Sequence, residues 1–535
     1  MDSAVYNELN RAWKSTCRTV LKGEMGELIE FEDWLKQYML RPRIEKSASS
    51  GKEVYLAVHE YCKDARFIGL DELNFNKKFE PISINQAKDI DSVVEALQDR
   101  FLYTGNIVLG KSNFVARSTS IQNSNYVYNS SQVFDSNRIA HSHHTKLNEN
   151  VFGGEFTGEN TKFCIRVCDT YNVLRSLEAW NSLNCGDCYY VFGLTGSQEC
   201  MFSFNLKSRK YCIGNLSLER DKYMSLKDKL LTEVRERLSK EKKLLTLIDL
   251  VTGAKDYRKE LKSLFKEVES RVDYKKEEYD KQKMEKSFEG VSQIILGRKL
   301  TDMDSYSSWF LKHIKPLKLP TSVISGRKIT LRTGSGNFDL FPKERIVTIE
   351  EANVLSEKLH LDLGEAESLN LDNAGDIIGK IAYSNIDYAF ESKNCLESAT
   401  PYYSRDCYRV GIPAWSNESG YSFWPRNADH MFGTDSTNTA SFCIHTYYSV
   451  GLSRAFETDN CTNCSDVYFA HNCENVRNSM FCFNAKNLSN AVGNAVYAPE
   501  QYKKIKDSLV AQIADELELK KDFKWDIYNV GCCER

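Results

Sequence analysis

Histidines and cysteines are the residues of this chain whose types and spacing could support chemistry. His141, His143 and His144 form the only histidine cluster of the sequence, in the stretch HSHH. An imidazole changes protonation near neutral pH and can serve as a general base, so these three residues are the candidate catalytic group. The sequence offers no clear partner acid for them. A turn or surface position without chemistry is the alternative for the cluster.

Two CxxC pairs are the candidate metal ligands. They are Cys185 with Cys188, in CGDC, and Cys461 with Cys464, in CTNC. Such pairs suit zinc, whose thiolate ligands lie about 2.3 Å from the metal. The pairs occupy different positions of an internal repeat described below, which favours packing in a core over a shared zinc site. A redox role is a third alternative. We therefore expect no cofactor, with zinc as the alternative.

The elements that would hold these residues show a period of six. Serine recurs from Ser112 to Ser142 at every sixth residue, and a branched apolar residue follows three places later, from Val115 to Ile139. The second half repeats the phase with serines at 392, 398 and 404. A fixed step of six with β-type residues predicts a β-solenoid, with three six-residue strands in each coil of eighteen. Short antiparallel strands with repeated turns are the alternative.

Such a solenoid would stack residues of equal phase about 4.8 Å apart, the spacing of neighbouring strands. The branched residues would point inward and form apolar ladders. Many cysteines share the step of six: Cys395, Cys407, Cys443, Cys461 and Cys473 are separated by multiples of six, and Cys188, Cys200 and Cys212 by twelve. We expect them to be small, buried members of the inward ladders.

The chain also contains an internal repeat. Residues 163–231 align with residues 442–510 at a constant offset of 279, and 21 of the 69 positions are identical. Upstream, residues 33–56 align with residues 308–331, which pairs Trp34 with Trp309. These matches predict a tandem duplication of one unit with a mixed α+β fold, in which each copy has a small α/β module, a β-solenoid lobe and a closing helix. A charged helical hairpin is expected between the copies.

The repeat predicts six segments along the chain. Residues 1–100 and 291–380 would be the two α/β modules, 101–216 and 381–495 the two β-solenoid lobes, 217–290 the charged helical hairpin, and 496–535 the C-terminal helix and tail. Strand-like alternation stands out at 52–58 and 327–332, and Pro499 suits the first turn of the last helix.

The stretches NCGDCYYVFG, ECMFSFNLKSRKYCIGN and SLERDKYMSLKDKL (within 184–231) resemble a group of uncharacterised proteins from uncultured bacteria and phages. Those proteins carry Asn-Cys and Ser-Cys hexads before a short YCI-x-N and a Tyr-containing helix. The resemblance covers residues of about 112–230 and 384–510, and this chain has far fewer cysteines. It implies a β-solenoid and transfers no activity.

Composition bounds the possible functions. With 535 residues, of which 41% are hydrophobic, the chain is long enough to form several hydrophobic cores. Its net charge of −3 does not favour nucleic-acid binding. The start lacks the pattern of a secretory signal, and no stretch approaches the roughly 18 apolar residues of a membrane span. We therefore expect a location in the cytoplasm or in a virus particle, with reduced thiols rather than disulfides among the seventeen cysteines.

Three functional hypotheses follow. The first is a non-enzymatic scaffold whose two lobes bind protein partners or further copies of the chain, within a large assembly such as a virion. The second is an enzyme similar to hexapeptide-repeat acyltransferases, which place a catalytic histidine beside their coils; here His141, His143 and His144 would serve. The third is a zinc-stabilised binding module with the two CxxC pairs as ligands.

Overall fold

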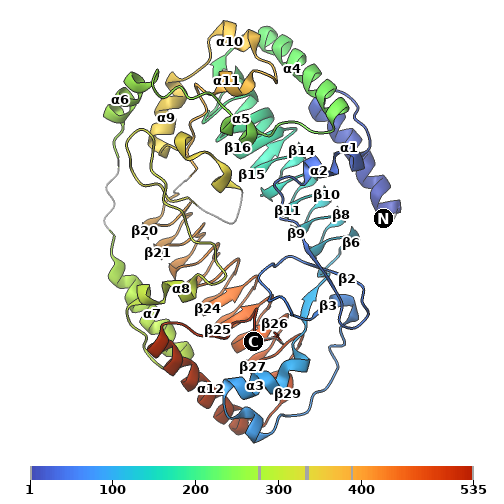
Figure 1. Ribbon diagram of the computed structural model, residues 1–535, viewed down its shortest axis with the longest axis vertical. Helices are drawn as coiled ribbons and strands as arrows, with labels where there is room; N and C mark the ends of the chain where they lie inside the picture. The colour runs from blue at the N-terminus through green and yellow to red at the C-terminus, as the bar shows by residue number, and fades with distance from the viewer. Residues whose placement is uncertain (1–2, 275–278, 332–336, 387–389, 533–535) are drawn as a thin grey trace. The chain divides into compact units, whose positions relative to one another are not determined.

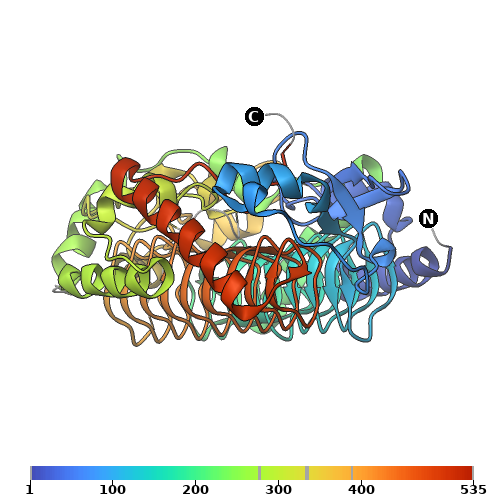
Figure 2. The same ribbon diagram turned by 90° about the horizontal axis from the view of Figure 1, so that it is seen from below.

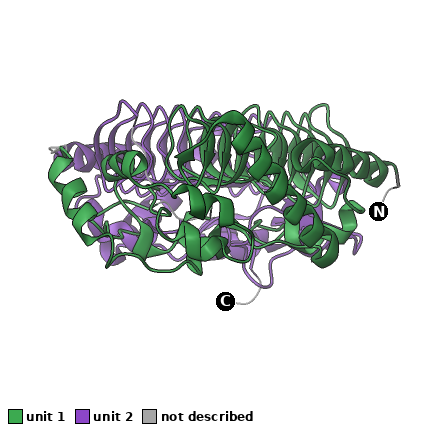
Figure 3. Ribbon diagram, turned by 90° about the horizontal axis from the view of Figure 1, so that it is seen from above, with its two compact units in different colours: residues 1–43, 107–275, 318–387 green, residues 44–106, 276–317, 388–535 purple. Residues whose placement is uncertain are grey.

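The chain folds into two compact units that contain parallel β-sheets and helices (Figures 1 and 3). This computed structural model describes residues 3–274, 279–331, 337–386 and 390–532. Unit 1 comprises residues 1–43, 107–275 and 318–387, and unit 2 comprises residues 44–106, 276–317 and 388–535. Each unit is therefore assembled from three separate stretches of the chain. The predicted module 1–100 is divided between the units at residues 43 and 44.

Helices accompany the sheet in each unit. Unit 1 contains α1 (Ser3–Leu21), α2 (Glu32–Leu35), α4 (Arg220–Glu241), α5 (Leu247–Thr252), α6 (Lys262–Arg271), α9 (Ile349–Lys358), α10 (Leu363–Ser368) and α11 (Ala374–Ile378). Unit 2 contains α3 (Ile90–Leu97), α7 (Lys281–Leu296), α8 (Ser307–Phe310) and α12 (Pro499–Lys520). As expected, Pro499 occupies the first turn of its helix.

A 15-stranded sheet forms the body of unit 1. Its strands are β5 (Val108–Leu109), β6 (Asn113–Ala116), β7 (Thr119–Gln122), β8 (Asn125–Tyr128), β9 (Ser131–Phe134), β10 (Asn137–Ala140), β11 (His143–Lys146), β12 (Glu149–Phe152), β13 (Glu155–Thr157), β14 (Lys162–Ile165), β15 (Cys168–Leu174), β16 (Leu177–Phe192), β17 (Gln198–Met201), β18 (Lys210–Ile213) and β19 (Leu216–Ser217).

A 10-stranded sheet forms the body of unit 2. Its strands are β20 (Lys393–Leu396), β21 (Arg405–Tyr408), β22 (Asn417–Gly420), β23 (Asp429–Phe432), β24 (Ser441–Tyr447), β25 (Ser453–Asp459), β26 (Ser465–His471), β27 (Arg477–Met480), β28 (Ser489–Val492) and β29 (Ala495–Val496). Two small pairs, β1 (Arg43–Lys46) with β2 (Glu53–Leu56) and β3 (Phe67–Gly69) with β4 (Tyr103–Gly105), complete the strands. The predicted strand at 327–332 forms only isolated bridges over its described residues.

Most neighbouring strands in both large sheets are parallel and pair at a step of twelve residues; β5–β7, β12–β14 and β13–β15 pair at a step of thirteen, and the last pair of each sheet is antiparallel. Asn137 pairs with Asn125 on one side and with Glu149 on the other, and Cys407 pairs with Cys395. Figure 2 shows the strands of each sheet in a regular row. The register is consistent with a solenoid-like path in which each turn takes twelve residues. The prediction of three strands and eighteen residues per turn is therefore wrong, because two six-residue stretches already complete a turn.

The serines of the six-residue pattern form a hydrogen-bond ladder. The Ser130 hydroxyl donates to the Tyr128 carbonyl over 2.8 Å and accepts the Ser142 N–H over 3.1 Å. Ser118 and Ser124 make the same two contacts, each accepting an N–H from the residue twelve places later. The ladder thus satisfies backbone groups that the tight turns leave buried, and its serines have a structural role.

The apolar positions of the pattern fill the inside of each turn. Ile121, Val127, Val133 and Ile139 are fully buried and share one cluster with Cys188 and Cys200. Cys188, Cys200 and Cys212 occupy successive rungs, since Cys200 pairs with both of the others. The expectation of inward apolar ladders that include cysteine is therefore confirmed.

Tight corners recur at every third residue. Tyr126, Asn129, Gln132 and Asp135 have φ values between 45° and 55°, so one turn of twelve contains four left-handed residues. The left-handed region favours Gly, Asn and Asp, and Asn is frequent at these corners, for example at 172, 184, 463, 475 and 487. Some of the corner side chains are exposed, for example those of Asn123, Asp135 and Leu147.

The charged segment 217–290 differs from the predicted two-helix hairpin. Helix α4 ends at Glu241, and α5 and α6 follow as separate shorter helices in unit 1, whereas α7 belongs to unit 2. Leu247, Leu250 and Val251 are buried in the core of unit 1. Burial of these apolar residues turns the chain inward and separates α5 from α4, which explains the difference.

Candidate functional site

The three candidate histidines lie on consecutive corners and strands of the first sheet and point to different neighbours. His141 Nδ1 lies 3.3 Å from Asn129 Nδ2, and His144 Nδ1 lies 2.8 Å from Gln132 Oε1. His143 Nδ1 lies 2.9 Å from Glu155 Oε1. Each partner is twelve residues away, on the adjacent turn. The structure therefore does not bring the three imidazoles together on one reacting atom.

Glu155 is the partner acid that the sequence did not reveal. His143 is only 5% exposed, and its Nε2 is buried with no hydrogen-bond partner. A carboxylate that fixes one imidazole nitrogen and leaves the other unpaired is the arrangement of a general base. However, the buried Nε2 does not reach solvent, so the pair as it stands is closed to a substrate. The register of twelve is the signal that would have identified Glu155.

His141 is buried without a carboxylate partner. It is 1% exposed, at a corner with φ 53°. Burial, reinforced by the positive charges of Lys36 and Arg41, lowers the pKa of His141 to about 3. The imidazole is therefore neutral at physiological pH and stays so under mildly acidic conditions.

A buried ion pair lies two turns further along the sheet. The Arg166 Nε donates to Glu178 Oε1 over 2.6 Å, and both side chains are almost completely buried. The second oxygen of Glu178 accepts the Trp180 indole N–H over 2.9 Å and the Leu247 backbone N–H over 3.0 Å. The Arg166 guanidinium also lies 5.4 Å from the Trp34 ring. This glutamate thus joins the sheet to the start of α5.

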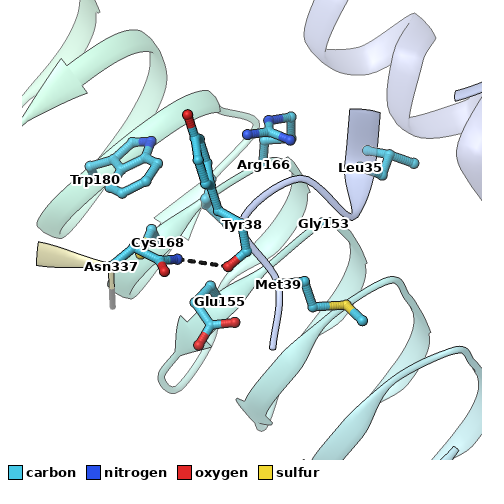
Figure 4. Close-up of a pocket in the computed structure, with 10 residues that line it drawn as sticks. Leu35, Tyr38, Met39, Gly153, Glu155, Arg166, Cys168, Trp180 and Asn337 are labelled. Carbon is cyan, nitrogen blue, oxygen red and sulfur yellow. Dashed lines mark hydrogen bonds between the residues drawn. The ribbon is translucent and has the colours of Figure 1, made fainter. Parts of the chain in front are cut away.

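A small pocket of unit 1 adjoins both charged pairs. It is lined by Leu35, Tyr38, Met39, Gly153, Glu155, Arg166, Val167, Cys168, Trp180 and Asn337 (Figure 4). The Asn337 side-chain amide donates to the Tyr38 carbonyl over 2.8 Å. The pocket has room for about one water molecule. A metabolite-sized substrate does not fit without a rearrangement.

Unit 2 has a counterpart of this charged cluster. His445 Nδ1 contacts Glu457 Oε1, and Glu457 Oε2 accepts the Ile527 backbone N–H over 2.9 Å. Both side chains are fully buried. Burial lowers the pKa of His445 and raises the pKa of Glu457. As in unit 1, a glutamate of the sheet binds a backbone N–H of a later segment.

A second buried carboxylate in unit 2 fixes the segment that precedes the first sheet in the sequence. Asp459 Oδ2 accepts hydrogen bonds from the Tyr61 hydroxyl over 3.0 Å and from His471 Nδ1 over 2.8 Å. His471 Nε2 accepts the Thr104 backbone N–H over 2.8 Å. Every one of these groups is used to hold backbone or side chain in place, which assigns the cluster a packing role.

The CxxC cysteines lie inside the ladders. The Cys185 thiol donates to the Leu183 carbonyl over 3.3 Å, and the Cys464 thiol donates to the Thr462 carbonyl over 3.3 Å. Their hydrogen bonds with Cys188 and Cys461, together with burial, raise the pKa of both thiols. Hydrogen bonds with Cys185 and Cys200 lower the pKa of Cys188 instead. All four thiols donate to backbone carbonyl groups inside the ladders, which favours a packing role. Over the described ranges, the only group of three or more potential ligands is elsewhere, at Cys62, Asp64 and Cys532.

One disulfide corrects the prediction that all cysteines are reduced. Cys62 and Cys532, which are 470 residues apart in the sequence, form a disulfide in unit 2. Such a distant pairing is not visible as a local motif, because a disulfide requires only that two Cα atoms approach in the fold.

Comparisons of the chain with protein-family models, curated proteins and solved structures gave no match. Among the helices that the structure describes, none is both long and apolar enough to span a bilayer.

Proposed function

We propose that the protein is a non-enzymatic scaffold built from two copies of one unit, each with a β-solenoid lobe and an α/β module. It presents its lobes to protein partners or to further copies of itself within a large assembly, such as a virus particle or a cytoplasmic complex. The net charge of −3 does not favour nucleic acid as the partner.

Matching contacts in the two units support the duplication. Asn215 Oδ1 accepts the Phe204 N–H over 2.8 Å, and Asn494 Oδ1 accepts the Phe483 N–H over 3.1 Å. In each unit the sheet then ends in an antiparallel strand and continues into a 22-residue helix, α4 or α12. These contacts lie at the sequence offset of 279, between residues that are identical in the two copies, and the two helices lie at the same offset.

The chain segments that make up each unit support an exchange of modules between the two copies. Residues 44–106 precede the first sheet in the chain but pack in unit 2, and residues 318–387 precede the second sheet but pack in unit 1. Arg100 Nη1 donates to the Gly493 carbonyl over 2.7 Å, and Asn205 Nδ2 donates to the Tyr383 carbonyl over 2.6 Å. A reciprocal exchange makes each lobe depend on both halves of the chain.

One observation favours a scaffold over an enzyme. The buried His143–Glu155 pair does not reach solvent, whereas an aromatic pair on the second sheet is exposed. Tyr403 and Trp415 lie on adjacent turns of the second sheet, with exposed fractions of 42% and 47%. Their rings are 6.3 Å apart and inclined by 8°. Rigid, exposed Tyr and Trp side chains are the residues most enriched in protein-binding hot spots.

Sedimentation of the tagged full chain from its source cells tests this proposal. We expect a complex much larger than the 61.4 kDa chain, and the double variant Tyr403→Ser, Trp415→Ser should sediment as the chain alone. The matched control is Leu519→Ser, which removes an apolar side chain that is 81% exposed on α12. Wild-type protein that sediments as a single chain, or equal loss of the complex in the control, would contradict the proposal.

The His143–Glu155 pair favours a second candidate function, an enzyme similar to hexapeptide-repeat acyltransferases. In that case His143 would act as the base after the surrounding turns open. Replacement of His141, His143 and His144 by alanine separates the two proposals. Loss of a turnover with the complex intact would favour the enzyme, whereas loss of neither would favour the scaffold. The zinc-stabilised module with Cys185, Cys188, Cys461 and Cys464 has no comparable support, because these thiols donate to carbonyl groups.

A further inference from the structure

Cys62, Asp64 and Cys532 form a compact ligand set in unit 2. The two sulfur atoms and a carboxylate oxygen of Asp64 all lie within 4.8 Å of one another. The Cα atoms of the cysteines are 6.3 Å apart. Cys532 is buried, whereas Cys62 and Asp64 are partly exposed, so that the group can be reached from solvent. The cysteines inside the sheets lack this access.

Contacts other than the disulfide hold both cysteines in position. The Cys62 backbone N–H donates to the Tyr528 carbonyl over 3.3 Å. The Gln98 side-chain amide donates to the Cys532 carbonyl over 2.8 Å, and the Tyr103 hydroxyl donates to the Ile527 carbonyl over 2.7 Å. Because these hydrogen bonds do not involve sulfur, the two thiols remain close together after the disulfide is reduced.

We propose that this group is a redox-dependent zinc site, in which the Cys62 and Cys532 thiolates and the Asp64 carboxylate bind Zn²⁺ when the disulfide is reduced. Two thiolates and a carboxylate are ordinary zinc ligands, at about 2.3 Å for sulfur and about 2.0–2.2 Å for oxygen. Rotation of the cysteine side chains provides the wider separation of the sulfur atoms that the metal requires. Water occupies the fourth position.

The chemistry balances with a dithiol as the reductant. The dithiol transfers two electrons and two protons to the Cys62–Cys532 disulfide, becomes a disulfide itself and leaves two protein thiols. Zn²⁺ then displaces the two thiol protons, which pass to solvent. The disulfide and the zinc complex therefore exclude each other, and both fasten the C-terminal tail to the segment that contains Cys62. This inference does not depend on the scaffold proposal.

Native mass spectrometry of the full chain tests the site. One sample is kept oxidised, and one is reduced with dithiothreitol and desalted without oxygen; each then receives one equivalent of Zn²⁺. We expect the reduced protein alone to gain about 63 Da, the mass of zinc less two protons. A reduced protein that binds no zinc, or an oxidised protein that binds it equally, would overturn the proposal.

Variants assign the ligands. Cys532→Ser should abolish zinc binding, and Asp64→Asn should weaken it at least tenfold in competition with a chromophoric chelator. The double variant Cys461→Ser, Cys464→Ser, which changes cysteines buried in the second sheet, should bind zinc as the wild type does. If Cys532→Ser does not fold, the zinc affinity of Asp64→Asn and the Co²⁺ absorption spectrum of the reduced wild type test the ligands instead. Absence of a thiolate-to-cobalt absorption band, or full affinity in Asp64→Asn, would contradict the site.

Discussion

The Leu361 backbone N–H donates to the Gly214 carbonyl over 2.9 Å, and the Leu361 side chain covers the Cα of this glycine. Gly493 has the same relation to the Leu97 side chain in unit 2. Both glycines have φ 56° and follow the last long strand of their sheet. The leucines come from the segments 318–387 and 44–106, so each contact joins a sheet to a segment that is distant in the sequence.

Gly493→Ala should destabilise unit 2 because it meets two obstacles. The left-handed φ disfavours alanine, and a Cβ at this position would overlap the Leu97 side chain. The expected loss is about 2–4 kcal/mol, measured as a lower thermal midpoint. Gly297→Ala is the matched control, since Gly297 has φ 68° and open space around its Cα. It should lose only about 1 kcal/mol. Equal losses would show that the Leu97 contact contributes nothing.

Ser130→Ala should break one rung of the hydrogen-bond ladder. The variant leaves the buried Ser142 N–H without its acceptor, at a cost of about 1–3 kcal/mol. Ser208→Ala, at an exposed corner of the same sheet, should change stability by less than about 0.5 kcal/mol. Urea unfolding of the three proteins measures the difference. An unchanged midpoint for Ser130→Ala would remove the structural role assigned to the serines.

His141 should make the protein less stable in mild acid. Its pKa of about 3 in the folded chain lies below the usual value of about 6.5, so the unfolded chain binds the extra proton between these values. Stability therefore falls as the pH decreases below about 6.5, by about 1.4 kcal/mol per pH unit for this group. His141→Asn removes the titrating group and suits the left-handed corner. Between pH 7.5 and pH 5 it should lose about 2 kcal/mol less than the wild type in urea unfolding. Parallel losses in both proteins would contradict the assignment.

Glu178→Gln should test the buried ion pair of unit 1. The variant leaves the Arg166 guanidinium without its counter-charge in a buried position, which costs about 3–5 kcal/mol. Glu149→Gln is the control, because the ion pairs of that half-exposed side chain contribute at most about 1 kcal/mol. Thermal unfolding at neutral pH compares them. Similar midpoints would show that the pair does not hold α5 to the sheet.

The sequence predicted local features of the fold well. The alternation of Ser130 with Val127 and Val133 identified which side chains point inward, because each third residue faces the interior whatever the length of a turn. It did not determine that length, since a period of six is compatible with turns of twelve and of eighteen. The partner of His143 was missed for the same reason: Glu155 becomes its neighbour only when a turn takes twelve residues.

Features that depend on contacts between residues far apart in the sequence could not be predicted from the sequence. Nothing in the residues near 43 and 44 indicates that the chain leaves one unit for the other there. Cys62 and Cys532 are likewise brought together by contacts between distant segments, which include the packing of Tyr61 against Tyr103 and Tyr528. The different positions of the two CxxC pairs in the repeat, by contrast, favoured packing over a zinc site, and these cysteines are buried ladder members.

Photocrosslinking of a cut chain most directly tests the proposed exchange of modules between two copies of one unit. A protease site replaces residues 275–278, and a photoreactive amino acid replaces His360, which is exposed next to Leu361. After cleavage and illumination, we predict that the fragments are joined covalently into a species of about 61 kDa, with the crosslink near Gly214. A crosslink confined to residues 388–535, with the two fragments separating in denaturant, would contradict the exchange.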